Sequence, residues 1–386
     1  MNINFLRRLD RWLGPLLLSI IGPLGWLISA LLPGQHAGPA TAQRLVFLKL
    51  KGGGSLIIAL PALLAMRRAA ANAEFILVCT PETKVYAELT GVFDRYCLIE
   101  DKSALSLSMS ALKALATSFR ADICVDLEPN SILAAVFNVL TLAKRRFGFV
   151  KLEERYRRVA YTDAVSFNVF APIYVYYDQL AELFGAEPVT LSECREQLRR
   201  VIPTKTKEGT LKTIGLAPFT SDFARERMMP DGIWSGLLKN YLGSAPARLL
   251  VIGSANNEAM GKSFTATLQK DFPGFEINNL CGNMSLSEAA AIMASVDEIW
   301  AVDSGLLHIA RLLAPKCRSY WGPSSPAQRL RPIGGLEEET IYRQFACSPC
   351  VHAAGPPPCE GNNLCMKTML DPSPNLAPVW CVGGAL

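Results

Sequence analysis

Residues 299–310 read Ile299-Trp300-Ala301-Val302-Asp303-Ser304-Gly305-Leu306-Leu307-His308-Ile309-Ala310. The stretch begins with apolar residues, turns through Asp303-Ser304-Gly305 and continues with apolar residues at helical spacing. This pattern predicts a buried strand that passes directly into a helix. The first amides of a helix have no partner within it, and the helix dipole is positive there, so this turn is suited to a phosphate. Asp303 or Ser304 can cap the helix, Gly305 permits close approach of a ligand, and His308 lies one turn further along. The alternative to a phosphate site is an ordinary capped helix in which the hydrogen bonds of His308 are satisfied within the protein.

Length and composition favour two globular domains. The chain has 386 residues, of which 50% are hydrophobic, which is enough to bury two ordinary cores. The net charge of +5 is modest, and no basic stripe is interleaved with aromatic residues, which argues against nucleic acid as a partner. The charge is compatible with anionic membranes or phosphorylated substrates.

The order of apolar segments predicts an α/β fold with parallel sheets, because strand-like runs alternate with helical stretches. In the first half we expect strands at 45–50, 75–79 and 123–127, helices at 56–71 and 132–143, and a long helix at 167–184. After a hinge at 203–209 the pattern restarts, with strands near 213–217, 249–253, 299–302 and 318–321. We therefore predict one domain at 43–205 and a second at 210–386.

Residues 1–34 form a separate hydrophobic segment that we expect to associate with a membrane. The stretch from Trp12 to Leu32 carries no charge and as a helix would be about 30 Å long, enough to cross a bilayer. Gly14-Pro15 and Gly22-Pro23 should break it into short pieces, which favours a re-entrant or interfacial anchor held by tryptophans and the preceding arginines. A spanning helix, and a signal peptide suggested by Ala40-Thr41-Ala42, are the alternatives.

A series of short motifs runs through the chain in a recognisable order. Asp303-Ser304-Gly305-x-x-His308-x-Ala310 is followed by Tyr320-Trp321-Gly322-Pro323-Ser324-Ser325-Pro326. Upstream stand Met284-Ser285-Leu286, Arg227 ahead of Pro230, and Gly-Ser ahead of Leu60-Pro61-Ala62-Leu63. Together they resemble the family 9 glycosyltransferases, the lipopolysaccharide heptosyltransferases. The resemblance covers most of the chain after residue 43, strongly in the second half and loosely in the first.

The resemblance implies the GT-B fold, with two Rossmann-like domains facing a cleft. The acceptor domain would be 43–205, and the nucleotide-sugar domain 210–386, including the cysteine-rich loop 347–365. It also implies an inverting enzyme of the bacterial cell envelope that transfers a heptose or related sugar from an ADP-sugar to a lipopolysaccharide core-type acceptor and requires no cofactor. Its partners would be ADP-heptose as donor, a glycolipid acceptor and the cytoplasmic face of the inner membrane, where the protein would be peripheral or monotopic.

The donor site is predicted from the residues and the resemblance together. Arg227, where the family usually has Lys, can neutralise the diphosphate, because its planar fork suits two phosphate oxygens. Thr220 and Ser221 precede it in a loop and can supply hydroxyl and amide donors. Glu258 resembles the family's ribose-contacting acid and Met284 the methionine near the base, with a core methionine as the alternative for Met284. The site is completed by Asp303, Ser304, Gly305 and His308.

The glycine-rich loop Lys51-Gly52-Gly53-Gly54-Ser55 departs from the family. It has neither the dinucleotide nor the P-loop spacing, so neither NAD nor ATP hydrolysis is indicated, and it is either a tight turn or a substrate-facing loop. Relatives carry Asp after the last glycine as the expected general base, whereas Ser55 cannot accept a proton near neutral pH. Glu128 and Asp126, at the end of a strand, are the candidates to replace this base. The alternative is that they are solvated residues that only end the strand.

Two other interpretations of the function compete with this one. The chain could be a catalytically silent relative that binds nucleotide or glycolipid, or it could be a transferase that uses another nucleotide sugar.

Four cysteines lie close together near the carboxyl end, in Cys347-Ser348-Pro349-Cys350 followed by Cys359 and Cys365. Thiols at this spacing could fold a loop rich in Pro and Gly around one structural zinc ion. Free or redox-active thiols are the alternative. The other cysteines, scattered singly within apolar runs, are expected in the cores.

Overall fold

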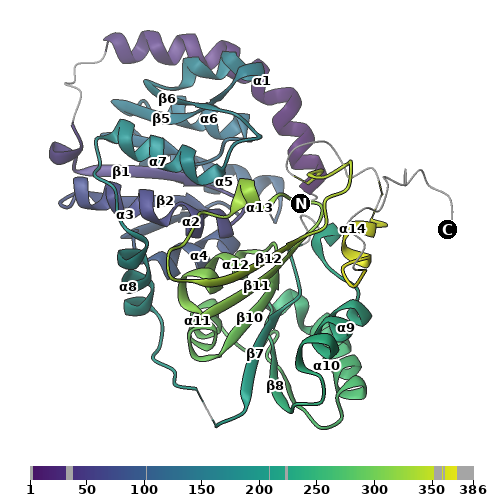
Figure 1. Cartoon of the computed structure of the whole chain (residues 1–386). Helices are drawn as coiled ribbons and strands as arrows, with labels where there is room; N and C mark the ends of the chain where they lie inside the picture. Colours follow the sequence, from purple (N-terminus) through teal and green to yellow (C-terminus); the bar gives the residue numbers. More distant parts are fainter. Residues whose placement is uncertain are drawn as a thin grey trace. The chain divides into compact units, whose positions relative to one another are not determined.

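The computed structural model describes residues 3–31, 38–100, 102–207, 209–221, 225–351, 359 and 361–371. The chain separates into two compact units, Met1–Cys194 and Arg195–Leu386, and each contains one sheet (Figure 1). The boundary between the units falls inside helix α8 (Leu191–Val201).

The first unit is built on six parallel strands in the order β3-β2-β1-β4-β5-β6. The central pair, β1 and β4, is in register with Leu48 opposite Asp126. The strands are β1 (Arg44–Lys49), β2 (Glu74–Cys79), β3 (Arg95–Leu98), β4 (Ile123–Asp126), β5 (Arg145–Lys151) and β6 (Asp163–Phe167).

The second unit repeats this plan with strands in the order β12-β11-β10-β7-β8-β9, again all parallel. The strands are β7 (Lys212–Ala217), β8 (Ala247–Val251), β9 (Glu276–Asn279), β10 (Glu298–Val302), β11 (Lys316–Trp321) and β12 (Glu337–Tyr342).

Both sheets have the strand order of a Rossmann fold. In each, the chain starts in the middle, builds one half of the sheet, and returns to the middle to build the other half. The return creates a switch point between β1 and β4 in the first unit and between β7 and β10 in the second. At a switch point the loops from the carboxyl ends of the two strands diverge, which leaves room for a ligand.

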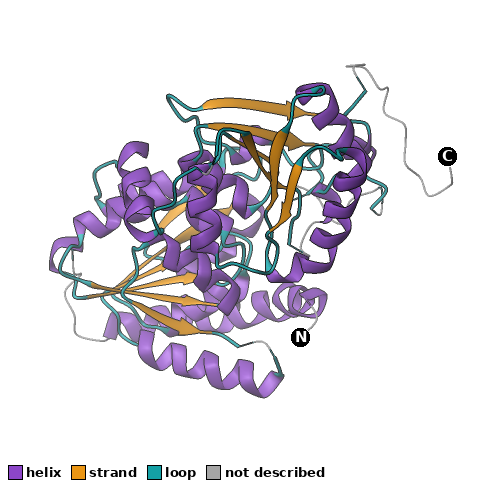
Figure 2. Cartoon of the chain, turned by 90° about the horizontal axis from the view of Figure 1, so that it is seen from below, coloured by secondary structure: helices purple, strands orange, loops and turns teal. Residues whose placement is uncertain are grey.

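Helices connect the strands and pack against the sheets (Figure 2). In the first unit they are α1 (Ile3–Leu31), η1 (Pro39–Thr41), α2 (Gly54–Ile58), α3 (Leu60–Ala69), α4 (Pro81–Thr90), α5 (Ala104–Ser118), α6 (Ile132–Leu140), η2 (Leu152–Ala160) and α7 (Ile173–Phe184). After α8, the second unit has η3 (Arg225–Arg227), α9 (Asp231–Leu242), η4 (Ala255–Asn257), α10 (Glu258–Asp271), α11 (Leu286–Ser295), α12 (Gly305–Leu313), α13 (Pro326–Arg329) and α14 (Leu364–Lys367).

Two predictions about helices are wrong. The stretch 167–184 is not one helix, because its first residue ends β6 and α7 begins only at Ile173, after Pro172. The residue before a proline avoids the helical conformation, so the helix begins only after Pro172. The predicted breaks at Gly14-Pro15 and Gly22-Pro23 are also absent. Helix α1 runs from Ile3 to Leu31 with both prolines inside it, and Figure 1 shows that it bends.

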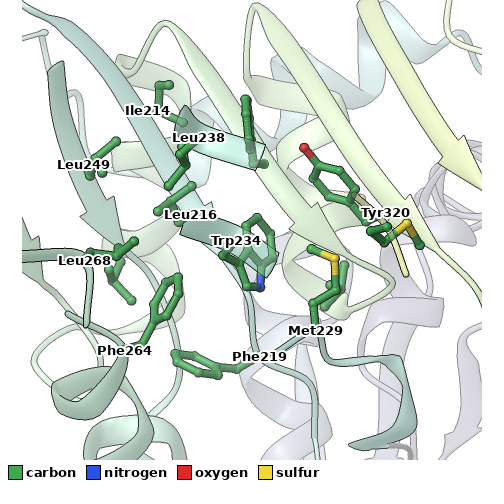
Figure 3. Packing of buried hydrophobic residues seen from close by; sticks show 14 of the residues in the cluster. Ile214, Leu216, Phe219, Met229, Trp234, Leu238, Leu249, Phe264, Leu268 and Tyr320 are labelled. Carbon is green, nitrogen blue, oxygen red and sulfur yellow. The ribbon is translucent and has the colours of Figure 1, made fainter. Parts of the chain in front are cut away.

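The main core cluster of the second unit contains several contacting aromatic rings and lies between its sheet and the helices α9 and α10. Trp234 of α9 is fully buried and contacts Tyr320 of β11 and Phe264 of α10 edge to face, with ring centroids 5.4 and 6.2 Å apart (Figure 3). Such pairs add about 0.5–1.5 kcal/mol to the area they bury. This packing fixes the strands whose ends carry the predicted donor residues.

Helix α1 is part of the first unit. It packs along α6 and η2, and Leu18 is completely buried with Ile132, Val136 and Tyr161. The carboxylate of Asp10 accepts hydrogen bonds from the amides of Ile132 and Leu133, at 3.1 and 2.8 Å, and from the hydroxyl of Ser131 at 3.0 Å. A negative charge at the amino end of α6 also interacts favourably with its dipole.

We expect Asp10→Ala to lower the free energy of unfolding of the full chain by about 0.5–2 kcal/mol, the range for a lost helix cap. Urea unfolding followed by circular dichroism measures the change. Glu187→Ala, at an exposed loop position, is the matched control and should leave the unfolding midpoint unchanged. Equal midpoints for Asp10→Ala and the unsubstituted chain would show that α1 contributes no cap to α6.

Candidate functional site

The switch point of the second sheet places a helix amino end beside β7, where Ala217 lies opposite Ala301 of β10. All residues of β10 are buried, and the chain turns through Asp303 and Ser304 into α12 as predicted. Of the two predicted capping residues, Asp303 and Ser304, Ser304 occupies the N-cap position, but its side chain makes no capping hydrogen bond. The N-cap side chain therefore does not occupy the first amides of α12, which suits them to an anion.

Arg227 and His308 flank the Asp303 carboxylate. Arg227 Nη1 lies 3.2 Å from Asp303 Oδ2, and His308 Nε2 lies 4.0 Å from Oδ1, with all three residues buried. The pKa of His308 is lowered to about 3, chiefly by burial and with help from the guanidinium groups of Arg311, Arg329 and Arg227, against the opposing effect of Asp303. The imidazole is therefore neutral at physiological pH.

Two buried hydroxyls at this edge have no hydrogen-bond partner among the residues that the structure describes. They are Ser304 Oγ and Ser324 Oγ, in residues that are 7% and 1% exposed. A buried hydroxyl left unsatisfied costs about 1–3 kcal/mol, and a ligand oxygen would remove that cost. Ser324 and Arg329 were not predicted as site residues, although the motif after β11 contained Ser324.

The carboxyl-terminal segment braces both turns of the site. Asn363 Nδ2 donates to the carbonyls of Glu226 and Met228, at 2.7 and 2.9 Å, on either side of Arg227. The amides of Cys350 and Val351 donate to Pro323 O at 2.9 Å, beside Ser324. No sequence pattern indicates this role for Asn363, because the two partners are backbone atoms more than 130 residues away.

The other predicted donor residues lie at the carboxyl ends of β7, β8 and β9. Thr220 is buried, whereas Ser221 is exposed. Glu258 is exposed at the start of α10, and a Cβ placed on Gly282 would lie 3.2 Å from Glu258 Cβ. Glu258 therefore lies beside the turn that leads to the half-buried Met284.

At the switch point of the first sheet, Glu128 holds the loop that follows β1. Its Oε1 accepts hydrogen bonds from the amides of Leu50 and Lys51, at 2.7 and 2.8 Å, and its Oε2 lies 3.2 Å from Lys49 Nζ. Burial lowers the pKa of Lys49, but the adjacent Glu128 carboxylate more than offsets this, so the pKa lies above its ordinary value. The buried ammonium group is thus held in its charged form.

Asp126 lies deeper than Glu128 and supports it. Its Oδ1 accepts from the amide of Glu128 at 2.8 Å and its Oδ2 from the hydroxyl of Tyr161 at 2.7 Å, with Arg157 Nη2 3.7 Å away. Burial raises the pKa of Asp126 to about 6, although Arg157 and the Tyr161 hydroxyl favour the charged form. Asp126 is 0% exposed and Glu128 8%, so Glu128 is the candidate base with some access to solvent.

The glycines of the loop are required by the turn itself. Gly52 has a φ of +75°, and a Cβ on Gly53 would lie 2.1 Å from the ring of Tyr86. The Ser55 hydroxyl donates to Gly52 O at 2.6 Å and so closes the turn. These contacts explain Gly52 and Gly53 by the local geometry of the loop, as expected if the loop is a tight turn.

The four carboxyl-terminal cysteines do not form a metal site in the structure. Among the described residues, which include all four, no three His, Cys, Asp or Glu side chains are arranged to hold a metal ion. Burial raises the pKa of Cys350 to about 11 and that of Cys365 to about 12, so both thiols are protonated near neutral pH. The prediction of a structural zinc ion at Cys347, Cys350, Cys359 and Cys365 is therefore unsupported.

Comparison with known proteins identifies a family. The model of glycosyltransferase family 9 (heptosyltransferase) matches residues 111–358. The lipooligosaccharide heptosyltransferase 2 of Haemophilus influenzae is 28% identical over 135 residues, which are 35% of this chain and 37% of that protein. The aligned stretch thus spans little more than a third of the relative's length.

Solved structures show the same fold. The Escherichia coli ADP-heptose lipopolysaccharide heptosyltransferase II superposes with a TM-score of 0.56 at 19% identity, covering 78% of this chain and 90% of that one. An E. coli heptosyltransferase solved with ADP-2-deoxy-2-fluoro heptose gives a TM-score of 0.59 at 15% identity, covering 83% and 98%. The predicted GT-B fold of two Rossmann-like domains, preceded by an apolar helix, is confirmed.

We expect the His308 imidazole to stay neutral from pH 8 down to about pH 5, because its pKa lies near 3. Of the three histidine signals in an NMR titration, one should remain constant over this range and disappear in His308→Gln. An unfolded histidine takes up a proton below about pH 6.5. His308 therefore contributes stability that is present above that pH and is lost as the pH falls toward 3. A titration of this signal near pH 6.5 would contradict the burial argument.

Proposed function

Because the chain belongs to glycosyltransferase family 9, we propose that it is an inverting transferase of the bacterial envelope that moves a heptose or related sugar from an ADP-sugar to a lipopolysaccharide core-type acceptor. The donor binds to the second unit, the domain at 210–386, and the acceptor to the first, at 43–205. Transfer takes place at the cytoplasmic face of the inner membrane, where the glycolipid acceptor is held.

The observation that carries the proposal is the turn at the amino end of α12. Arg227 there meets Asp303, and the hydroxyls of Ser304 and Ser324 are buried without a partner among the described residues. A diphosphate would accept hydrogen bonds from these hydroxyls, from the α12 amides and from Arg227. Glu258 and Met284 would meet the ribose and the base. One E. coli heptosyltransferase of the same fold was solved with ADP-2-deoxy-2-fluoro heptose, which supports an ADP-sugar for this chain as well.

Inverting transfer needs two kinds of assistance. A base takes the proton of the acceptor hydroxyl while its oxygen bonds to the anomeric carbon from the face opposite the diphosphate. The bond between that carbon and the diphosphate oxygen breaks, and the nucleoside diphosphate leaves with the electron pair. Arg227 and the α12 amides stabilise the charge that develops on the leaving group.

We assign the base to Glu128, with Asp126 as the alternative. Glu128 lies next to the loop that bears Ser55, the position where relatives carry Asp, and it has some access to solvent. Asp126 would support Glu128 by fixing its backbone amide.

A catalytically silent relative is the second candidate function. Two observations favour it. Position 55 carries a serine and not a carboxylate, and both carboxylate oxygens of Glu128 are already engaged, one by the amides of the loop and the other by Lys49. In that case the chain would bind nucleotide or glycolipid without transferring sugar.

Arg227→Ala should weaken ADP binding by about 1.5–3 kcal/mol, the range for hydrogen bonds to a charged group. Isothermal titration calorimetry with ADP measures the change. Arg248→Ala, which removes an arginine from β8 that pairs with Glu276 at 2.8 Å, is the control and should bind ADP as the unsubstituted chain does. Equal affinities for the two variants would remove Arg227 from the donor site.

Glu128→Gln should reduce kcat by about 10² or more while ADP affinity stays unchanged, because a general base acts on the acceptor. Release of ADP from ADP-heptose with extracted lipopolysaccharide core acceptor follows turnover. Loss of the acidic limb of the kcat/KM profile would distinguish a base from a residue that only holds the loop.

Ser55→Ala is the control for Glu128→Gln and should change kcat little, and Asp126→Asn tests the alternative base. An active unsubstituted chain in which neither carboxylate variant slows turnover would overturn the assignment of the base. ADP binding without any transfer would favour the silent relative.

A further inference from the structure

From Trp12 to Leu31, helix α1 carries no charged residue, but only one of its faces is covered by the first unit. Glycines line the covered face at Gly14, Gly22 and Gly25, where an added Cβ would lie 2.7, 2.6 and 2.3 Å from atoms of Ile132, Val159 and Val139. The backbone of α1 therefore approaches α6 and η2 more closely than any side chain would allow. Together with Leu18 and the Asp10 cap, these contacts fix which face of α1 points inward.

The opposite face of α1 is a continuous apolar surface. Trp12 is 78% exposed, Ile20 61% and Trp26 64%. Trp12, Leu16, Ile20, Leu24 and Leu27 recur every three or four residues, so they form one stripe along the helix, on the side away from the glycines. The other exposed large apolar residues of this face are Leu13, Ile28 and Leu31.

The 3₁₀ segment η2 continues this surface beside α1. Leu152 is 71% exposed and Tyr156 42%, and Arg155 between them is exposed as well. An apolar surface of this extent on a soluble protein marks an interaction site.

We propose that the outward face of α1 and the adjoining residues of η2 lie in the surface of an anionic lipid bilayer, with α1 parallel to the membrane plane and still packed on the first unit. Charge supports this partner. Among residues 1–31, Asp10 is the only acidic residue, and its carboxylate accepts hydrogen bonds at the amino end of α6. Arg7, Arg8 and Arg11 are basic. On η2 the exposed Arg155 is offset by the exposed Glu153, so the basic excess lies at the amino end of α1. Basic residues flanking an apolar stripe with exposed tryptophans are typical of helices that lie in an anionic interface.

A spanning arrangement of α1 conflicts with its packing. By length and composition, Asp10–Ile28 could cross a bilayer. To do so, α1 would have to leave α6, which would expose Leu18 and its partners in the first unit and remove Asp10 from the amino end of α6. The glycine contacts along three turns would be lost at the same time.

This inference rests on the proposed function only for the membrane location, and its test needs neither donor nor acceptor. The full chain is sedimented with vesicles of phosphatidylethanolamine and phosphatidylglycerol, and with vesicles of phosphatidylcholine alone. We expect tighter binding to the anionic vesicles, with a salt dependence. Ile20→Glu should weaken partitioning about tenfold or more, because it places a charge where an apolar side chain enters the interface. Leu183→Glu, at a 44% exposed leucine of α7, is the matched control and should partition like the unsubstituted chain.

The orientation of α1 is measured by depth-dependent quenching of a tryptophan at position 20. Ile20→Trp is introduced into Trp12→Phe/Trp26→Phe, and the same background with Ile20 supplies the signal of the remaining tryptophans. A helix in the membrane plane gives stronger quenching by bromines near the lipid carbonyls than by bromines near the chain ends. The reverse order indicates a spanning helix and overturns the proposal.

Two further outcomes would also overturn it. Equal partitioning of Ile20→Glu and Leu183→Glu removes the stripe as the binding surface. A dimer of the full chain that Ile20→Glu dissociates, without vesicle binding, assigns the face to a second copy. ADP titration of the same preparations separates these outcomes from a failure of the donor site, because a vesicle-binding protein that ignores ADP contradicts only the proposed activity.

Discussion

Parallel pairing at the centre of each sheet is the constraint on which the rest of the structure depends. When β10 pairs with β7, the chain has already built one half of the sheet, and the helices on either side of the pair must leave on opposite faces. The loops that follow these two strands therefore leave in different directions. Because the strands end side by side, Arg227, which follows β7, still meets Asp303, which follows β10, although they are 76 residues apart in the sequence. The same topology between β1 and β4 brings the glycine loop to Glu128, which follows β4.

The carboxyl-terminal segment shows how a site built on loops is kept in place. Arg227 is in a short 3₁₀ turn that offers little rigidity of its own, and Asn363 fixes the carbonyls before and after it. The hydrogen bonds from Cys350 and Val351 to Pro323 act in the same way on the turn that carries Ser324. These hydrogen bonds thus give the described residues of this cysteine-rich region a structural role at the site.

The sequence predicted the central strands β1, β2, β4, β7, β8, β10 and β11, because buried parallel strands are continuous apolar runs, and it predicted the helix start after β10. It did not predict β3, β5, β6, β9 and β12; of these, β3, β6, β9 and β12 are only partly buried and lack such a run. It failed where tertiary contacts decide. Pro15 and Pro23 are tolerated inside α1 because the helix gains a whole packed face against α6 and η2. A helix that is apolar all round carries no periodicity, so the sequence could not tell which face is covered. The roles of Asn363 and Asp10 were hidden for a related reason, since both act on distant backbone atoms.

The two switch points share a topology but carry different residues at the strand ends. At the end of β10, Arg227 and the amino end of α12 lie beside the buried carboxylate of Asp303 and the neutral His308, and this is where we propose that the diphosphate binds. At the end of β4, the carboxylates of Glu128 and Asp126 lie beside Lys49 and Arg157, and burial raises the pKa of Asp126 to about 6. Under the proposed function, a carboxylate there would take the proton of the acceptor hydroxyl, and Arg227 with the α12 amides would stabilise the departing diphosphate. One strand arrangement, used twice with different residues at the strand ends, would then provide for both halves of a sugar transfer.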